Sequence, residues 1–456
     1  MTGFRVVLAI LIANQLRLAV STMIPALYPW VRQPLLGRIG WTGLALTGIV
    51  ASVLFGRAAL RYRDRCISGV TLAVFLAWPL IPLNFGQALW RSKHTPQLPP
   101  ASESSVGMEA REDAWKDGVS RVVWVLFDEW DYRLTFEDRP SDLAMPELEA
   151  LAGESLVARR AYPTSSETGL SVPSLVTGRE IKRLAPLGDD DAEVVLDAEP
   201  ATRRLREMDS VFAEMRRRGV PTAVAGWYLP YCRIWRESLD YCEWQETDSE
   251  RVMRAETVGE SVQDSFRSFL ETGVLSPFGV SLAAERARRT SLKLWAASES
   301  ALRDRRYRFV FLHLPIPHAP FYYDRRTGGT RKGNNYVSGY FDHLALLDKT
   351  LGAVIGVLRE SGSWADTALL VSSDHGFRSA RALDGKSDPR IPFLLRIPRR
   401  QGSTVAEFPF QTLVSRQLIA GLMSGRIGTQ AEAVSFLRRH SVQKGCRHAH
   451  PGEAIQ

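Results

Sequence analysis

Two strongly apolar runs of this chain end directly in acidic residues, and this pattern constrains the fold more than any other feature. Residues 121–129 read RVVWVLFDE, and residues 368–376 read ALLVSSDHG. Strands that are apolar on both faces are typical of parallel sheets covered by helices. Side chains that follow such strands gather at one edge of the sheet, where ligands bind. The sequence therefore predicts an α/β domain with Asp128, Glu129, Asp374 and His375 at that edge.

Predicted strands and helices alternate over residues 119–400. Residues 341–360 carry apolar side chains at helical spacing, which indicates a helix that packs on the core. Further helices are predicted at residues 145–155 and 208–218, and further strands at 222–225, 309–314 and 391–397. This order predicts a mostly parallel sheet sandwiched by helices over residues 119–400, followed by a helical tail over residues 401–456.

The first ninety residues are more apolar than the rest of the chain. With their flanks, residues 41–55 and 70–83 each approach the roughly 20 residues that cross a bilayer. Residues 4–27 form a third span or an interfacial helix. Arginines 57, 61, 63 and 65 lie between the two runs, so this loop is expected in the cytoplasm.

These features predict a transmembrane helical region of two or three helices over residues 1–91. A linker rich in Pro, Ser, Glu and Lys follows over residues 92–118. The expected location is the inner or plasma membrane, with the catalytic domain on the extracytoplasmic (periplasmic) side.

Charge and cysteine content exclude other classes of protein. The net charge of +8 comes largely from arginine runs in helix-like segments, which indicate solvated helix faces. No nucleic-acid-binding motif accompanies them, so no nucleic-acid partner is predicted. The four cysteines form neither a disulfide scaffold nor a zinc cluster. Cys232 and Cys242 are either bridged, in an oxidising compartment, or two free thiols.

The residue types at the sheet edge suit one divalent cation and a hydroxyl nucleophile. Carboxylates and an imidazole bind such a cation, which activates a hydroxyl for attack on phosphorus or sulfur. Residues 164–177 hold several serines and threonines, and their composition leaves the nucleophile open. His318, flanked by prolines after a strand, is expected to assist the leaving group or bind the transferred anion. His313 lies inside that strand and is predicted to be a packed or supporting residue.

Two segments resemble the sulfatase branch of the alkaline phosphatase superfamily. Residues 145–152 (MPELEALA) are similar to that family's MPNLDRLA helix, and residues 174–179 (SLVTGR) resemble its SLLTGR. Residues 168–173 (TGLSVP) resemble the nucleophile segment of the phosphoethanolamine transferases that modify lipid A. Residues 312–324 (LHLPIPHAPFYYD) resemble their histidine loop.

The resemblance implies that Thr168 is the nucleophile and also a metal ligand. Glu129 matches the transferase ligand and Asp128 the first acid of the sulfatase pair, whereas Asp374 and His375 match both families. The two-zinc pattern Asp-x-x-x-His is absent, which favours one metal ion. Zinc, manganese, calcium and magnesium all suit the ligand types.

Departures from the two families favour phosphoester chemistry. Val172 stands where sulfatases have Arg, and Gly226-Trp227-Tyr228-Leu229 lacks the Lys and His of their GKWH segment. The transferases' downstream histidine is missing between residues 377 and 392, so Lys386 or Arg390 is expected to bind substrate in its place.

The sequence thus predicts a membrane-anchored, metal-dependent phospho-group transferase or hydrolase that acts through a covalent Thr168 intermediate. Its expected substrate is a membrane lipid or an envelope glycan. A sulfatase with unmodified threonine and a catalytically silent envelope binding protein are the alternatives.

Overall fold

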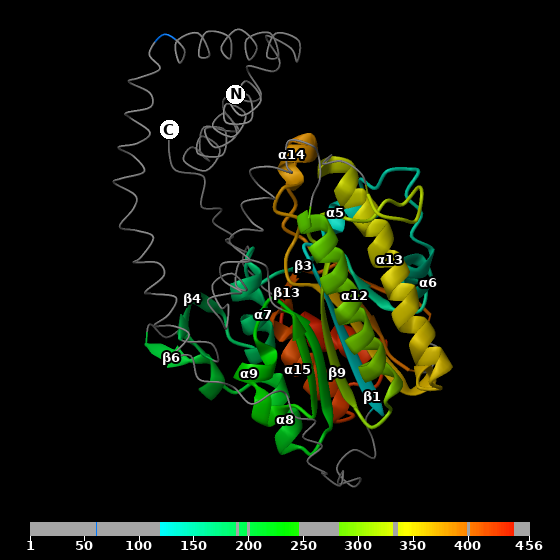
Figure 1. Cartoon of the computed structure of the whole chain (residues 1–456). Coiled ribbons are helices and arrows are strands. Elements are labelled where there is room, and N and C mark those ends of the chain that lie inside the picture. The colour runs from blue at the N-terminus through cyan, green and yellow to red at the C-terminus, as the bar shows by residue number, and fades with distance from the viewer. Residues whose placement is uncertain are drawn as a thin grey trace. The chain divides into compact units, whose positions relative to one another are not determined.

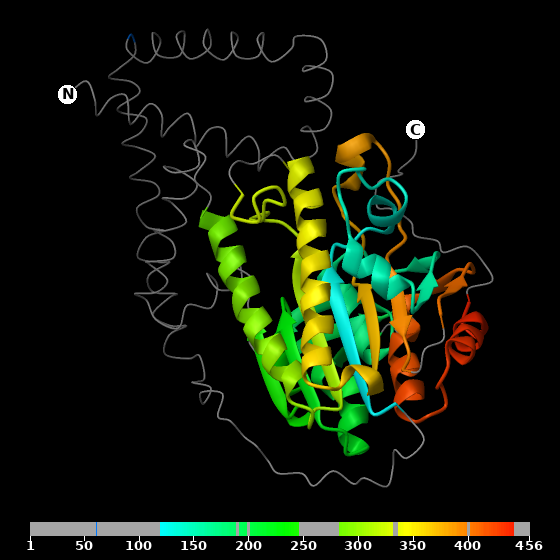
Figure 2. The same ribbon diagram turned by 90° about the vertical axis from the view of Figure 1, so that its right-hand side faces the viewer.

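The structure is a computed structural model (Figures 1 and 2). It describes residues 119–187, 191–197, 201–245, 282–331, 336–398 and 402–441, together with Arg61. Residues 119–245 and 282–441 belong to the larger of two compact units. The predicted transmembrane region and linker lie outside the described residues, apart from Arg61. Within the described ranges, no helix is long and apolar enough to cross a membrane.

An eight-stranded sheet forms the centre of the larger unit. β1 (Arg121–Asp128) lies between β10 (Thr367–Ser373) and β9 (Phe309–Pro317), parallel to both. The sheet continues past β9 with β7 (Thr222–Trp227) and β8 (Tyr241–Gln245), and past β10 with β11 (Phe393–Arg396), β2 (Leu156–Ala158) and β12 (Thr404–Ala406). Among these described strands, β11 alone runs antiparallel to its neighbours. The predicted mostly parallel sheet is therefore confirmed.

Helices cover both faces of the sheet, because successive side chains of a strand point to opposite sides. Val123, Val125 and Phe127 of β1 belong to the core beneath α6 (Pro146–Ala152), α12 (Leu282–Arg303) and α13 (Tyr336–Glu360). Val122, Trp124 and Leu126 belong to the core beneath α7 (Thr168–Thr177), α8 (Val211–Arg217) and α15 (Ser415–Met423). Figure 2 shows the two helical layers with the sheet between them.

Shorter elements surround this sandwich. β4 (Ile181–Leu187), β5 (Asp191–Leu196) and β6 (Thr202–Arg204) form an antiparallel sheet, and β3 (Ala161–Tyr162) pairs with β13 (Phe410–Gln411). The remaining α-helices of the described ranges are α5 (Tyr132–Phe136), α9 (Tyr231–Ile234), α14 (Ala380–Asp384) and α16 (Gln430–Arg439). A disulfide joins Cys232 of α9 to Cys242 of β8, which decides between the two states that the sequence left open.

The chain beyond residue 400 differs from the predicted helical tail. β12 is an edge strand of the main sheet, parallel to β2, and α15 packs beside β1 and α7. The boundary predicted at residue 400 therefore falls inside the larger unit. Three residues are too few to show the alternation that identifies a strand, so β12 was not predictable from its residues.

Candidate active site and metal centre

The ends of β1 and β10 bring two acids together. Phe127 and Ser373 are paired in the parallel register, so Asp128 and Asp374 emerge side by side. The backbone N–H of Asp374 donates to the carbonyl of Phe127 at 3.2 Å, which continues the ladder by one residue. Both aspartates are fully buried. Parallel pairing thus places two carboxylates at the sheet edge, as predicted.

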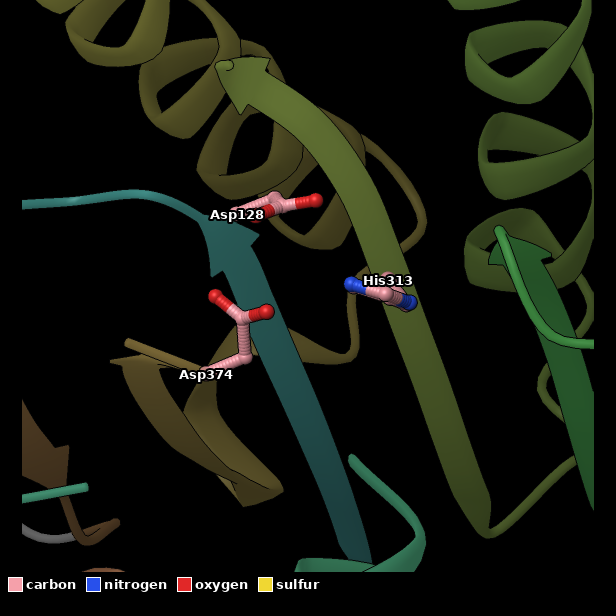
Figure 3. Close-up of side chains that lie close together, drawn as sticks. All are labelled: Asp128, His313 and Asp374. Atoms are coloured by element: carbon pink, nitrogen blue, oxygen red, sulfur yellow. The ribbon is translucent and has the colours of Figure 1, made fainter. Parts of the chain in front are cut away.

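His313 of β9 completes a three-residue cluster with these aspartates (Figure 3). One potential ligand atom from each of Asp128, His313 and Asp374 lies within 4.8 Å of the other two. Among the described residues, Asp128 Oδ2, Asp374 Oδ2 and His313 Nε2 have no hydrogen-bond partner. Buried polar atoms without partners are unfavourable unless a further group satisfies them. The donor set therefore fits a divalent cation, which two carboxylates and a neutral imidazole would hold.

Burial shifts the pKa of His313 and of Asp128 in this cluster. It lowers the pKa of His313 to about 4, so the ring is neutral and free to act as a ligand. Burial also raises the pKa of Asp128 well above its ordinary value, and the nearby charges of Asp374 and Glu129 add to this effect. A divalent cation would offset the repulsion among these carboxylates.

Thr168 contacts the same cluster from the first turn of α7. Its Oγ1 lies 3.1 Å from Nε2 of His375 and donates to Oδ1 of Asp128 at 3.4 Å. The Thr168 residue is buried, with 4% of its surface exposed. Because a helix N-terminus carries partial positive charge, this position favours negative charge on the hydroxyl oxygen.

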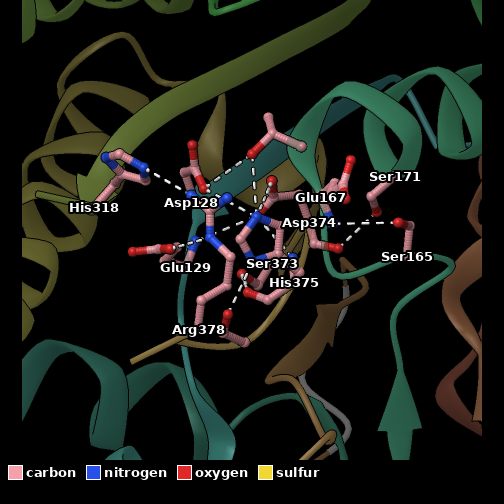
Figure 4. Close-up of polar contacts among 12 residues, drawn as sticks. Asp128, Glu129, Ser165, Glu167, Ser171, His318, Ser373, Asp374, His375 and Arg378 are labelled. Carbon is pink, nitrogen blue, oxygen red and sulfur yellow. Dashed lines mark hydrogen bonds and ion pairs between the residues drawn. The ribbon is translucent and has the colours of Figure 1, made fainter. Parts of the chain in front are cut away.

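Two hydrogen bonds fix the surroundings of Thr168 (Figure 4). Ser171 Oγ donates to the carbonyl of Asp374 at 2.6 Å, which ties α7 to the end of β10. His375 Nδ1 lies 2.8 Å from the carbonyl of Gly376, and donation to this oxygen leaves Nε2 with its lone pair toward Thr168. The structure therefore brings Asp128, Thr168, Asp374 and His375 together around one point.

Glu129 is the exception among the predicted metal ligands. Its carboxylate accepts a hydrogen bond from Arg378 Nε at 2.6 Å, and its backbone has a φ of 64°. The left-handed conformation turns the chain at the end of β1, and the Glu129 N–H donates to Asp374 Oδ1 at 3.2 Å. Glu129 thus contributes its backbone to the cluster and its side chain to Arg378. Its role as a ligand stays a prediction.

His318 lies beside this ion pair at the end of β9. Its Nε2 is 3.2 Å from Arg378 Nη2, its Nδ1 contacts the carbonyl of Ala319, and its ring centroid is 5.2 Å from that of Trp227. Burial lowers the pKa of His318, so the ring is neutral. Donation from Nδ1 to Ala319 leaves Nε2 as the acceptor for Arg378.

A family model described as Sulfatase matches residues 120–412. The chain belongs to the sulfatase family. This membership confirms the predicted place in the alkaline phosphatase-like superfamily and makes the chain a sulfatase-superfamily hydrolase or transferase. The search of curated proteins found no match.

Several solved structures are similar to this sulfatase-family chain. The phosphonate monoester hydrolase of Agrobacterium radiobacter is 13% identical, with a TM-score of 0.43, over 67% of this chain and 77% of that one. The lipoteichoic acid synthase LtaP from Listeria monocytogenes is 15% identical, with a TM-score of 0.43, over 72% and 78%. The PsFucS1 sulfatase from Pseudoalteromonas sp. is 15% identical, with a TM-score of 0.46, over 67% and 68%.

The two cations predicted to contact substrate in this sulfatase-family site have other partners. Lys386 Nζ lies 3.4 Å from Asp138. Arg390 binds Asp388 and Glu137, and its guanidinium lies 4.6 Å from the ring centroid of Tyr132. Each therefore neutralises acids outside the cluster, and the structure gives no support to either as a substrate contact.

Sequence reasoning missed two residues of the site. His313 was expected to pack or support, but its Nε2 faces the carboxylates. Arg378 received no role, yet it is the cation that contacts Glu129 and His318. Its place three residues after His375 was the available signal, since this loop leaves the same sheet edge.

Proposed function

We propose that the chain is a metal-dependent enzyme that transfers or hydrolyses a phospho-substituent through a covalent intermediate on Thr168. The observation that carries this proposal is the placement of Thr168 Oγ1, buried at the start of α7 and 3.1 Å from His375 Nε2. A nucleophilic hydroxyl needs a group that activates it and an environment that favours its anion. His375 Nε2 supplies the first, and the N-terminus of α7 together with a bound divalent cation would supply the second.

Each side chain has a defined part in this reaction. Thr168 Oγ1 forms a bond to phosphorus while the bond from phosphorus to the leaving oxygen breaks. The proton of the hydroxyl has two acceptors within 3.4 Å, His375 Nε2 and Asp128 Oδ1. A bound divalent cation would lower the pKa of the hydroxyl and offset charge on the transferred group. The leaving oxygen takes up the proton that Thr168 releases, and His318, whose ring is neutral, would take the proton of the alcohol or water that later accepts the group.

Thr168 favours phosphoester over sulfate-ester chemistry. A threonine has no route to the formylglycine on which sulfatases depend, and Trp227 and Leu229 replace the Lys and His of their GKWH segment. A sulfatase acting with unmodified threonine is the second candidate, which family membership supports.

The proposed setting is the outer face of the inner or plasma membrane. The apolar runs before residue 91 and the arginine-rich loop between them support an anchor with this orientation. The Cys232–Cys242 disulfide supports an oxidising compartment. An anchored enzyme meets substrates held in or near the membrane, so we propose a membrane lipid or an envelope glycan as substrate.

The test compares the native chain with Thr168→Ala and Thr168→Ser, each loaded with zinc or manganese. Bis(4-nitrophenyl) phosphate and 4-nitrophenyl sulfate serve as alternative substrates. Loss of the nucleophile is expected to lower kcat by about a thousandfold or more, and serine is expected to retain part of the rate. Full activity in Thr168→Ala would refute the nucleophile. Faster turnover of the sulfate ester would favour the sulfatase, and the absence of bound metal would favour a silent binding protein.

A further inference from the structure

Arg378 occupies the rim of the site between two groups that the proposed reaction uses. It follows the Asp374-His375-Gly376 segment and precedes α14. Its Nε donates to Glu129 Oε1 at 2.6 Å, and its Nη2 donates to His318 Nε2 at 3.2 Å. Figure 4 shows the guanidinium reaching across from its own loop toward both side chains.

Two nitrogens of the Arg378 guanidinium are hydrogen-bonded within the site, but about half of the side chain is accessible to solvent. The Arg378 side chain is 48% exposed, whereas that of Glu129 is only 5% exposed. A guanidinium has five N–H donors in a rigid plane, and the two contacts with Glu129 and His318 use two of them. The side chain is thus fixed in direction and still has donor capacity at the mouth of the site.

An anionic substrate needs a cation at this mouth. The guanidinium of Arg378 stays charged, because arginine does not lose its proton in proteins, and the carboxylates of Asp128, Glu129 and Asp374 lie near it. The same three carboxylates repel an approaching anion, and a divalent cation offsets only part of this charge. Lys386 and Arg390 are paired elsewhere. Among the residues that the structure describes, Arg378 is the cation in contact with His318.

Trp227 limits the direction of approach to His318. Its ring lies against the imidazole with a centroid distance of 5.2 Å, and the Nε2 edge of the imidazole faces Arg378. A group that reaches His318 Nε2 therefore meets the guanidinium at the same time.

We propose that Arg378 binds a non-bridging oxygen of the transferred phosphoryl group. This inference rests on the proposed function. The planar fork of arginine matches phosphate oxygens, and such charge-assisted hydrogen bonds are stronger than neutral ones. Arg378 takes the part that the sequence had assigned to Lys386 or Arg390.

Calorimetric titration with inorganic phosphate tests this inference on the full-length, metal-loaded chain. Arg378→Gln is expected to weaken phosphate binding by at least about tenfold, and Arg378→Lys by less, because lysine keeps the charge but loses the fork. Arg381→Gln is the matched control, since Arg381 is an exposed neighbour on α14 whose Nη2 contacts Ser387 at 3.5 Å. This control is expected to bind phosphate normally.

Metal content and turnover separate the possible outcomes. Phosphate binding within twofold of native in an Arg378→Gln chain with full metal content would overturn the inference, because a purely structural ion pair predicts that result. If Arg378→Gln loses its metal, unchanged phosphate affinity in Arg378→Lys would overturn it instead. Titration needs no turnover, so loss of phosphate binding in the variant supports Arg378 even if no phosphodiester is cleaved. Phosphodiester turnover that persists with unchanged KM in Arg378→Gln would leave the proposed function standing and remove Arg378 from it.

Discussion

His313 shows how a single buried residue depends on remote support. Its Nδ1 lies 2.8 Å from the hydroxyl of Tyr231, a fully buried residue of α9. The ring of Tyr231 passes so close to β7 that a Cβ on Gly226 would lie 2.4 Å from it. Only glycine leaves room for this approach. A partner on the second nitrogen orients a ligating histidine and fixes its tautomer.

Tyr231→Phe is therefore expected to weaken binding of zinc or manganese by about 10- to 100-fold. The phenyl ring keeps the packing, so the thermal midpoint without metal should change little. Calorimetric titration with the metal measures the effect. Tyr241→Phe is the control, because the Tyr241 hydroxyl contacts the Ala297 carbonyl at 3.4 Å in another part of the fold. Equal metal affinity in the two variants would show that the Tyr231 hydroxyl does not support the metal site.

His343 of α13 is a second buried histidine, outside the cluster. Its Nε2 accepts hydrogen bonds from the backbone N–H groups of Tyr322 and Tyr323, at 2.9 and 3.3 Å. Burial, with a smaller effect of the Arg331 charge, lowers the pKa of His343 to about 3. Between these two pKa values the His343 ring is neutral in the folded protein. In the unfolded chain, where its pKa is near 6.5, the same ring binds a proton over this pH range.

His343 is expected to make the protein less stable as the pH falls. The contribution is fully present above pH 6.5 and is lost progressively between about pH 6.5 and pH 3. Over most of this window the unfolding free energy should fall by about 1.4 kcal/mol per pH unit from this residue alone. Urea denaturation at a series of pH values should show a slope smaller by this amount in His343→Gln than in the native chain. If the unfolding free energy of the two proteins depended on pH with the same slope, the lowered pKa of His343 would be contradicted.

At the scale of elements, α13 holds the loop that follows β9. A Cβ on Gly339 would lie 2.5 Å from the Phe321 ring of that loop, whereas a Cβ on Gly356 would meet no atom within 4 Å. The two glycines share one helix but differ in surroundings. Close packing near residue 339 therefore fixes the loop that carries His318.

Gly339→Ala is expected to destabilise the fold by about 1–3 kcal/mol, because the added methyl group must displace an aromatic ring. Gly356→Ala should stabilise it by up to about 1 kcal/mol, since alanine favours the helix and nothing obstructs it. Chemical denaturation of the native chain and of both variants measures these changes in unfolding free energy. If Gly339→Ala stabilised the fold, the Phe321 ring would have to move away from α13 at little cost, and close packing would not fix this loop.

At the scale of the whole molecule, the proposed anchor links the enzyme to its substrate. The full-length chain is expected to sediment with membranes and to resist extraction with alkaline carbonate, because its apolar runs, with their flanks, approach the roughly 20 residues that span a bilayer. A chain without residues 1–91 is the control and should remain in the supernatant. Release of the full-length chain by carbonate would contradict the anchor and remove the argument for a membrane substrate.

The sequence by itself determined the class of fold and the chemical character of the site. Apolar runs that end in acids require a covered parallel sheet, and the central strands lie where the pattern predicted them. The landmark segments singled out Thr168 among several hydroxyl residues by resemblance, and the structure places it against His375 and Asp128. These features follow from local pattern, which a chain displays before it folds.

Tertiary structure alone decided which neighbours share the site. Asp128 and Glu129 are adjacent in sequence, but the positive φ at Glu129 sends its carboxylate to Arg378 while Asp128 faces the cluster. His313 joins the aspartates because the register of β9 against β1 directs its ring toward them, and a shift of one residue would reverse that direction. Side-chain direction at a strand end depends on the register and backbone dihedrals of segments far apart in the chain, and the order of residues does not display either.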